Sequence, residues 1–415
     1  MHEMKNSGIA WLGEIPRDWR LSKIGSLYRQ RNEKVSDKDY QPLSVTMQGI
    51  LPQLATAAKT DDGDNRKLVR VGDFAINSRS DRRGSCGISP LDGSISLINI
   101  ILTPRTVMHP GYYNWLFHTT LFADEFYKWG HGIVADLWTT RWQEMKSITV
   151  PVPEYAEQER IATFLDAECA EIDAVLEKTR ASIEEYKKLK QAVITQVVTK
   201  GVRGDRPMKD SGIEWIGEIP AEWDLLNLVA HTSMLTPMRD RPENLDGPIP
   251  WVRIEDFDGK YIGASKAGLG VSMETVKEMN LKVYPVGTIL CTSSCIMGKC
   301  AIVSRELVSN QRFIGIIPDQ ATVKTYLYYL MASNAERMNF LSTGALQANL
   351  SRSAFEHLKV QFPPYSEQQE IAAYLDDKCG KIDALIAKKQ QYLTEIESYK
   401  TSLIYEYVTG KKEVT

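Results

Sequence analysis

The sequence predicts a mixed α/β protein in which two globular domains are separated by two long helices that pack on each other. Two internal repeats and one contrast predict this fold class. A stretch that begins at Pro153 recurs from Pro363, an opening motif at Ser7 recurs at Ser211, and the blocks between them differ in sequence. A repeat of this kind fixes the architecture before any motif is interpreted. Because the order opener, variable block and helix occurs twice, we expect a pseudo-twofold fold.

The repeated stretch predicts a long amphipathic helix. Apolar residues recur in both copies with heptad spacing over about five heptads, which is typical of a coiled-coil seam. At 1.5 Å rise per residue, about 40 residues span roughly 60 Å. One helix cannot bury so narrow a stripe, so we expect the other copy to cover it; the alternative is two separate surface helices. The seam residues expected are Leu165, Ile172, Leu176, Ile183, Leu375, Ile382, Ile386 and Leu393.

The exceptions to the apolar seam are matched between the two copies. Thr179 and Lys190 interrupt the first copy, and Lys389 and Lys400 interrupt the second at the same repeat positions. Matched exceptions favour two helices that meet each other.

The openers read SGIAWLGEIPRDW at residues 7–19 and SGIEWIGEIPAEW at residues 211–223, with nine of thirteen positions identical. They are too apolar for linkers. Each is interpreted as a strand and turn that docks on a helix end, with Pro16 and Pro220 fixing the turn. Residues 203–210 are interpreted as an exposed linker.

The two variable blocks share a faint skeleton. Short apolar runs broken by Gly, Asp and Pro predict strands in both. The segment 72–76 resembles 287–291, and each is followed by a turn that contains Gly and Cys. A shared scaffold with different loops is expected of two recognition modules for two ligands; a duplication that has lost its function is the alternative. The expected strands are 42–47, 67–71, 74–76, 95–102, 148–153, 250–254, 288–290, 313–317 and 360–363, and the expected helices are 111–129 and 323–340.

The composition limits the class of protein. With 43% hydrophobic residues among 415, the chain can bury real cores. No apolar run approaches membrane-spanning length and no signal region is evident, so a cytoplasmic protein is expected. The net charge of −3 excludes a broadly basic nucleic-acid binder, so any DNA binding must come from local patches or a basic partner.

The search for catalytic motifs predicts a non-catalytic chain. No phosphate-binding loop is present, and the pair Gly268 and Gly270 is a weak signal. Cys291, Cys295 and Cys300 lack the spacing of a structural zinc site, so no metal is expected.

Binding remains, and loop arginines are the candidates, since Arg can form paired hydrogen bonds with guanine and Ser or Asn can reach phosphates or base edges. The residues proposed for DNA binding are Ser78, Arg79, Arg82, Arg83, Arg239, Arg241, Arg253, Lys299, Gln347, Asn349 and Arg352.

Both repeats resemble the conserved regions of the specificity subunit of type I restriction–modification systems. The resemblance rests on the Gly-Glu-Ile-Pro-x-x-Trp openers, the Pro-x-x-x-Glu-Gln-x-x-Ile-Ala entries at Pro153 and Pro363, and the closing Val-Thr pairs at Val198 and Val408. These motifs span the whole chain in the family's order. The first copy closes Val-Thr-Lys-Gly where the second has Val-Thr-Gly-Lys, a small departure.

The resemblance implies two target recognition domains separated by two antiparallel coiled-coil helices. The expected boundaries are 1–152 for the first domain, 153–200 for the central helix, 201–362 for a linker and the second domain, and 363–415 for the C-terminal helix. Such a subunit reads a bipartite, asymmetric site in double-stranded DNA, and its helices set the gap between the half-sites.

The resemblance also implies partners. Two methyltransferase subunits, which carry S-adenosylmethionine, methylate adenine, and two restriction subunits join complexes that cleave DNA. No cofactor is expected in this chain. The alternatives are a non-catalytic assembly scaffold that binds proteins and a standalone adenine methyltransferase.

Overall fold

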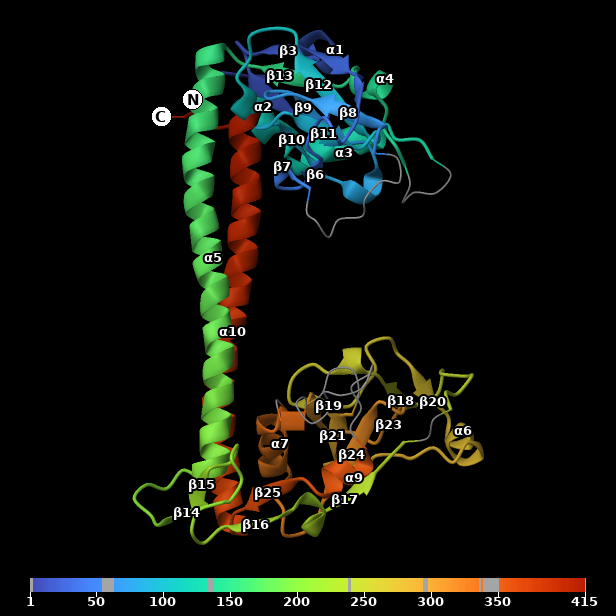
Figure 1. Cartoon of the computed structure of the whole chain (residues 1–415), viewed down its shortest axis with the longest axis vertical. Coiled ribbons are helices and arrows are strands. Elements are labelled where there is room, and N and C mark those ends of the chain that lie inside the picture. The colour runs from blue at the N-terminus through green and yellow to red at the C-terminus, as the bar shows by residue number, and fades with distance from the viewer. Residues whose placement is uncertain are drawn as a thin grey trace. The chain divides into compact units, whose positions relative to one another are not determined.

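The chain divides into two compact units. The structure, a computed structural model, describes residues 3–53, 63–132, 138–237, 240–293, 298–335, 337–338 and 351–414. One unit comprises Met1–Arg180 and Gln391–Thr415, and the other comprises Ala181–Gln390. Each long helix contributes residues to both units, since α5 runs Tyr155–Lys200 and α10 runs Tyr365–Val408 (Figure 1). The predicted domain boundaries, which follow the motifs, stay a prediction.

In the first unit, α5 and α10 lie against each other in opposite directions. Phe164 packs on Tyr407 with ring centroids 4.4 Å apart. Further along α5, the Asp173 carboxylate accepts from Lys400 Nζ at 2.6 Å. The numbers rise in α5 as they fall in α10, so the helices are antiparallel here.

In the second unit, the same relation holds for the other halves of the two helices. Tyr186 lies under Lys389, whose Nζ is 5.8 Å from the ring centroid. Lys190 Nζ donates to Asp383 at 2.7 Å. Lys190 and Asp383 occupy the repeat positions of Lys400 and Asp173, so these two seam lysines form the same ion pair in each unit.

The openers are β-hairpins that dock on helix ends. In the first, β1 (Met4–Asn6) pairs with β2 (Glu14–Pro16), and the following Trp19 donates from Nε1 to the Glu157 carboxylate of α5 at 3.0 Å. In the second, β14 (Met208–Asp210) pairs with β15 (Glu218–Pro220). Its Trp223 donates to the Glu367 carboxylate of α10, also at 3.0 Å. The Glu of each Glu-Gln motif therefore fastens an opener to a helix.

The Gln of each motif joins the helix to the adjoining module. The Gln158 side-chain oxygen accepts from the backbone N–H of His109, the N-cap of α2, at 2.9 Å. Likewise, the Gln368 oxygen accepts from Val323, the N-cap of α7, at 2.8 Å. Buried polar groups are normally hydrogen-bonded. Both Gln side chains therefore link a long helix to the start of a helix in the adjoining module.

The first module is built from small antiparallel sheets around an aromatic core. One sheet has the order β10-β9-β12-β4, another β11-β8-β5, and two-stranded sheets pair β6 with β7 and β13 with β3. The rings of α2 and α3 fill the core against α5 and the end of α10. Its elements are β3 Arg20–Lys23, α1 Ile24–Leu27, β4 Tyr28–Arg31, β5 Lys34–Val35, β6 Leu43–Thr46, β7 Gly49–Pro52, β8 Arg66–Val69, β9 Phe74–Asn77, η1 Ser80–Arg82, β10 Cys86–Ile88, β11 Gly93–Ile95, β12 Asn99–Pro104, α2 Pro110–Phe117, α3 Thr120–Lys128, α4 Trp142–Met145 and β13 Thr149–Val152.

The second module repeats this plan with additions. Its main sheet has the order β17-β24-β21-β22-β19, a second has β20-β18-β23, and β16 pairs with β25. Helix α7, the C-terminal end of α5 and the N-terminal part of α10 enclose its core. Its elements are β16 Asp224–Asn227, η3 Leu228–Ala230, β17 Thr232–Leu235, β18 Ile249–Val252, η4 Ile254–Asp256, β19 Tyr261–Ile262, β20 Gly270–Val271, α6 Met273–Glu278, β21 Ile289–Thr292, β22 Cys300–Val303, β23 Val308–Ser309, β24 Phe313–Pro318, α7 Lys324–Ser333, α9 Arg352–Glu356 and β25 Lys359–Phe362.

The shared skeleton of the two blocks is confirmed. The segment 72–76 leads into β9 and the segment 287–291 into β21, each strand pairing with the next in a hairpin. Gly72 and Gly287 have φ of 84° and 92°, and Gly84 and Gly298 have φ of 77° and 80°. These left-handed turns favour glycine at matching places.

Three local predictions are corrected. The run 95–102 is two strands, because Asn99 donates to the Ser96 carbonyl and closes a turn between β11 and β12. The helix expected over 111–129 is two helices, since the Thr119 hydroxyl accepts from Phe122 N at 3.2 Å and caps α3. The linker expected over 203–210 is exposed except at Arg206, whose side chain is 10% exposed, but its end is not a loop, because residues 208–210 form the strand β14. The end of the helix expected over 323–340 lies outside the described residues.

Candidate nucleic-acid interface

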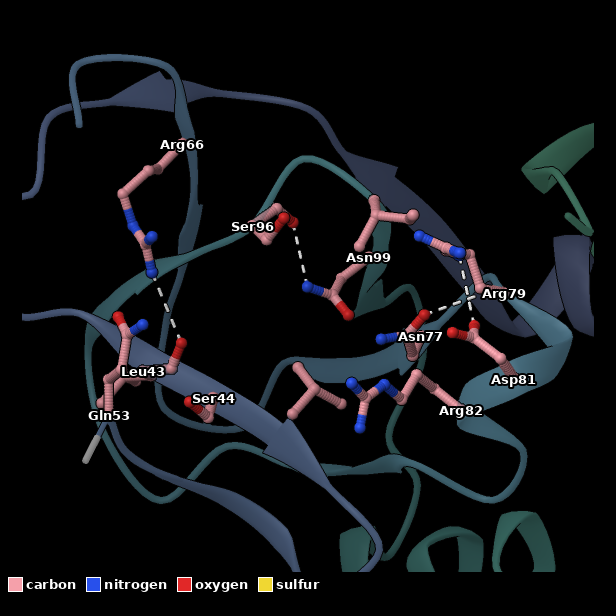
Figure 2. Close-up of a pocket in the computed structure, with 12 residues that line it drawn as sticks. Leu43, Ser44, Gln53, Arg66, Asn77, Arg79, Asp81, Arg82, Ser96 and Asn99 are labelled. Atoms are coloured by element: carbon pink, nitrogen blue, oxygen red, sulfur yellow. Dashed lines mark hydrogen bonds and ion pairs between the residues drawn. The ribbon is translucent and has the colours of Figure 1, made fainter. Parts of the chain in front are cut away.

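A polar hollow of about 350 Å³ lies in the first module, beside the arginine-rich loop. The loop joins β9 to β10 and contains the short helix η1. Figure 2 shows Arg82 reaching from this loop toward the middle of the hollow, with Ser44 and Gln53 on the far wall. The residues lining it are Leu43, Ser44, Val45, Gln53, Arg66, Asn77, Arg79, Asp81, Arg82, Ser96, Ile98 and Asn99.

Arg79, the N-cap of η1, and Arg82, within η1, differ in their ion pairs. Arg79 Nε lies 3.2 Å from Asp81 Oδ1, so its charge is partly balanced inside the hollow. Arg82 is exposed, and no ion pair joins it to another residue in the described ranges. The hollow thus offers one balanced arginine and one that is open to a ligand.

A buried arginine supports one wall of this hollow. Arg66, only 3% exposed, donates from Nε to the Ser94 hydroxyl at 2.9 Å and from Nη2 to the Ser94 carbonyl at 2.8 Å. Burial lowers the pKa of its guanidinium, because the charged form loses hydration. Its hydrogen bonds within the fold make Arg66 a structural part of the wall.

The second module has a hollow of about 400 Å³ with similar chemistry. Arg253 Nε lies 3.0 Å from Glu255 Oε1, which balances its charge. Arg241 and Arg312 are exposed, and neither forms an ion pair with a residue that the structure describes. The residues lining it are Arg241, Trp251, Arg253, Ile254, Glu255, Leu269, Asn310, Gln311 and Arg312.

The two hollows occupy equivalent places in the two modules. Each is lined by the loop that precedes a central strand, residues 96–98 before β12 and residues 310–312 before β24. A second strand also lines each hollow, β6 in the first and β18 in the second. Each of these strands runs parallel to the strand before the loop: Pro42, next to β6, bridges Ser94 of β11, and Trp251 of β18 pairs with Val308 of β23. The scaffold is therefore shared, while the side chains that it presents differ.

The structure gathers some predicted DNA-binding residues and separates others. Arg79 and Arg82 share the first hollow, and Arg241 and Arg253 share the second. Lys299, in the β21–β22 hairpin, is exposed but does not line the second hollow.

Three further predicted residues are engaged within the protein. Arg83 pairs with Asp124, and Arg352 pairs with Glu356 on the same helix. Ser78 is a correction: it is 2% exposed and its hydroxyl donates to the Ile98 carbonyl, so it serves the fold and cannot reach DNA. Arg239, Gln347 and Asn349 lie outside the described residues.

Sequence reasoning missed Arg312. It follows the short strand β23 and precedes β24, and Asn310 holds its backbone N–H at 3.0 Å. Residues 310–312, which include Arg312, correspond to residues 96–98 of the first module. That correspondence can be found only when the two modules are aligned strand by strand.

The predicted seam residues face the helix contact to different degrees. Leu165, Leu176, Ile183 and Leu375 are buried, whereas the others are half-buried. The half-buried residues are Ile172, Ile382, Ile386 and Leu393.

Within the ranges that the structure describes, no group of three or more His, Cys, Asp or Glu side chains could hold a metal ion. In the same ranges, no helix combines the length and apolarity needed to cross a membrane.

Comparisons with known proteins agree with this architecture. Residues 229–397 match the model of the type I restriction modification DNA specificity domain. The MjaIX specificity subunit of Methanocaldococcus jannaschii is 35% identical over 173 residues, which cover 39% of this chain and 40% of that protein. The MjaVIII specificity subunit of the same organism is 22% identical over 96% of this chain and 94% of its own length. The chain spans less than two thirds of the first two relatives it matches, 40% and 61%.

Solved structures share the fold over nearly the whole chain. A chain from a study of complex assembly and conformational transition of the type I R-M system superposes with a TM-score of 0.75 at 14% identity, covering 96% of this chain and 99% of its own. The HsdS subunit of Thermoanaerobacter tengcongensis gives 0.51 at 15% identity, covering 96% and 98%. At such identities the likeness establishes the fold alone.

The fold, in which each module packs on the two long helices, is that of these two solved chains. Its residues 229–397 match the DNA specificity domain of type I restriction modification systems, and along most of its length the chain is similar to specificity subunits of such systems. The predicted resemblance to specificity subunits of type I systems is confirmed by these matches.

Proposed function

We propose that this chain reads a bipartite, asymmetric sequence in double-stranded DNA and directs adenine methylation, and cleavage, by partner subunits. The observation that carries the proposal is the pair of equivalent hollows with different side chains. One scaffold with two linings suits two half-sites of different sequence, because hydrogen-bond donors and acceptors in the major groove distinguish all four base pairs.

The charge of the chain fits a reader that works within a complex. With a net charge of −3, it cannot supply the broad phosphate attraction that dominates affinity for DNA. Local arginines then provide base recognition, and partner subunits provide most of the phosphate contacts. The partners proposed are two methyltransferase subunits that carry S-adenosylmethionine, joined by two restriction subunits for cleavage.

The helix pair is the proposed spacer between the half-sites. Its matched ion pairs, Lys400 with Asp173 and Lys190 with Asp383, favour one antiparallel register. A helix pair of fixed register suits a fixed gap in the recognised sequence. No cofactor is assigned to this chain, and a cytoplasmic location is part of the proposal.

The test is long-read methylation mapping in a host that lacks DNA methylation. The host expresses the methyltransferase subunit with this chain, and a parallel culture expresses that subunit alone. We expect one bipartite adenine-methylated motif only when both are present. If affinity-purified complexes contain both subunits but no new motif appears and no DNA binding is measured, the scaffold alternative replaces the proposal.

A further inference from the structure

We infer that Arg82 and Arg312 are specificity-determining residues, each donating to the major-groove edge of guanine in a different half-site. The inference rests on the proposed function and deepens it. Within each hollow, one arginine is balanced by a carboxylate two residues later, Arg79 by Asp81 and Arg253 by Glu255. That pairing leaves Arg82 in the first hollow, and Arg241 and Arg312 in the second, as donors available to DNA.

The backbone of both arginines is fixed. The Arg82 carbonyl accepts from Ser85 N at 3.0 Å and from the Tyr127 hydroxyl at 3.3 Å. The Arg312 carbonyl accepts from Ser293 N at 2.8 Å, while its N–H donates to Asn310 Oδ1 at 3.0 Å. A fixed backbone reduces the ordering cost of a side-chain contact, and recognition groups held on a rigid scaffold discriminate best.

The surroundings favour a base edge over a phosphate. Each hollow contains a carboxylate, Asp81 or Glu255, which repels a phosphate but can accept from the amino group of cytosine. Amide side chains stand beside each arginine, Asn77 in the first hollow and Gln311 in the second, and amides can pair with adenine. This mixture of donors and acceptors matches base edges, whereas phosphate sites gather donors alone.

Exchanging arginine for lysine distinguishes a contact with a base edge from a contact with a phosphate. The guanidinium fork makes two parallel hydrogen bonds with guanine, which a lysine ammonium cannot reproduce, while either residue can neutralise a phosphate. Arg82→Lys and Arg312→Lys therefore keep the charge and remove the paired donors. Matched controls are Lys128→Ala in the first module and Lys266→Ala in the second, two exposed lysines outside the hollows.

The experiment maps methylation by complexes of each variant with the methyltransferase subunit. We expect Arg82→Lys to relax one base pair of one half-site by roughly 10- to 100-fold in discrimination, and Arg312→Lys to relax one base pair of the other. The unaffected half-site is an internal control for folding and assembly, and the lysine controls should keep the wild-type motif.

Three outcomes overturn the inference. An unchanged motif with both lysine variants excludes base reading by these side chains. A uniform loss of methylation in Arg82→Ala and Arg312→Ala, restored in Arg82→Lys and Arg312→Lys with the motif unchanged, assigns these side chains to phosphates. Relaxation of the same half-site by both variants refutes the assignment of one arginine to each half-site. If the wild-type complex itself yields no motif, the proposed function fails first, which separates the two failures.

Discussion

The fastening of the second opener to α10 gives a quantitative prediction for Glu367→Ala. The Glu367 carboxylate is 1% exposed and accepts from Trp223 Nε1 at 3.0 Å and from Arg206 Nη1 at 2.6 Å. The Arg206 guanidinium also lies over the Trp223 ring, 5.1 Å from its centroid. Three side chains from the opener region and the helix thus share one buried site.

Removal of the carboxylate leaves the Arg206 charge largely buried. Breaking a buried ion pair by deleting one partner costs about 3–5 kcal/mol. Two contacts remain to Arg206, Glu222 at 3.1 Å and the Lys200 carbonyl at 2.7 Å. We therefore expect a loss near the lower end, about 3 kcal/mol of local unfolding free energy.

Peptide-resolved hydrogen exchange should detect the loss of local stability in the hairpin at 208–220. Urea unfolding followed by tryptophan fluorescence should report the same loss for the whole protein. The matched control is Asp377→Ala, which breaks the exposed pair with Lys381 on the same helix and should cost under about 0.5 kcal/mol. Exchange in the hairpin as slow as wild type in Glu367→Ala would refute the reasoning.

Three further predictions concern the helix pair. Lys190→Asp should lower the free energy of unfolding of the second unit by about 1 kcal/mol, because it replaces an ion pair with two like charges. Adding Asp383→Lys should restore most of that loss, as measured by urea unfolding in a double-mutant cycle. Equal losses in the single and double variants would contradict the ion pair. Gly410→Ala should destabilise the protein by about 2 kcal/mol or more, because the φ angle of Gly410 is 70° and the new Cβ would clash with Pro16. The control is Gly204→Ala, whose Cβ would meet nothing within 4 Å, so this variant should melt like wild type in calorimetry. One heptad inserted into both helices should lengthen the spacer of the methylated motif, and an unchanged spacer would exclude the helices as the spacer device.

Much of the architecture was predictable because it is encoded in local periodicity. The heptad pattern predicted both long helices, and the recurring Trp of each opener predicted a segment that docks on a helix end. The matched glycines at 72 and 287 predicted related turns in blocks with little other similarity. Local conformational demands of this kind leave residue-type signatures.

The candidate site was predictable only in part. The loop at 78–83 was correctly singled out as arginine-rich, but the sequence could not separate the exposed Arg82 from the buried Ser78. It also gave no reason to select Arg312, which lines the second hollow beside Trp251 because β23 pairs with the distant strand β18. Side-chain availability depends on long-range packing, so composition alone could not rank these residues.

The sequence by itself determined the repeated order of opener, module and helix, and the absence of a recognisable catalytic motif in the chain. Only the tertiary structure decided which charges balance one another across the fold: Lys190 with Asp383, Lys400 with Asp173, and Arg206 with Glu367. The physical reason is range. Helix periodicity follows from neighbours a few residues apart, whereas an ion pair or a hollow exists only after segments far apart in sequence are brought within a few ångströms.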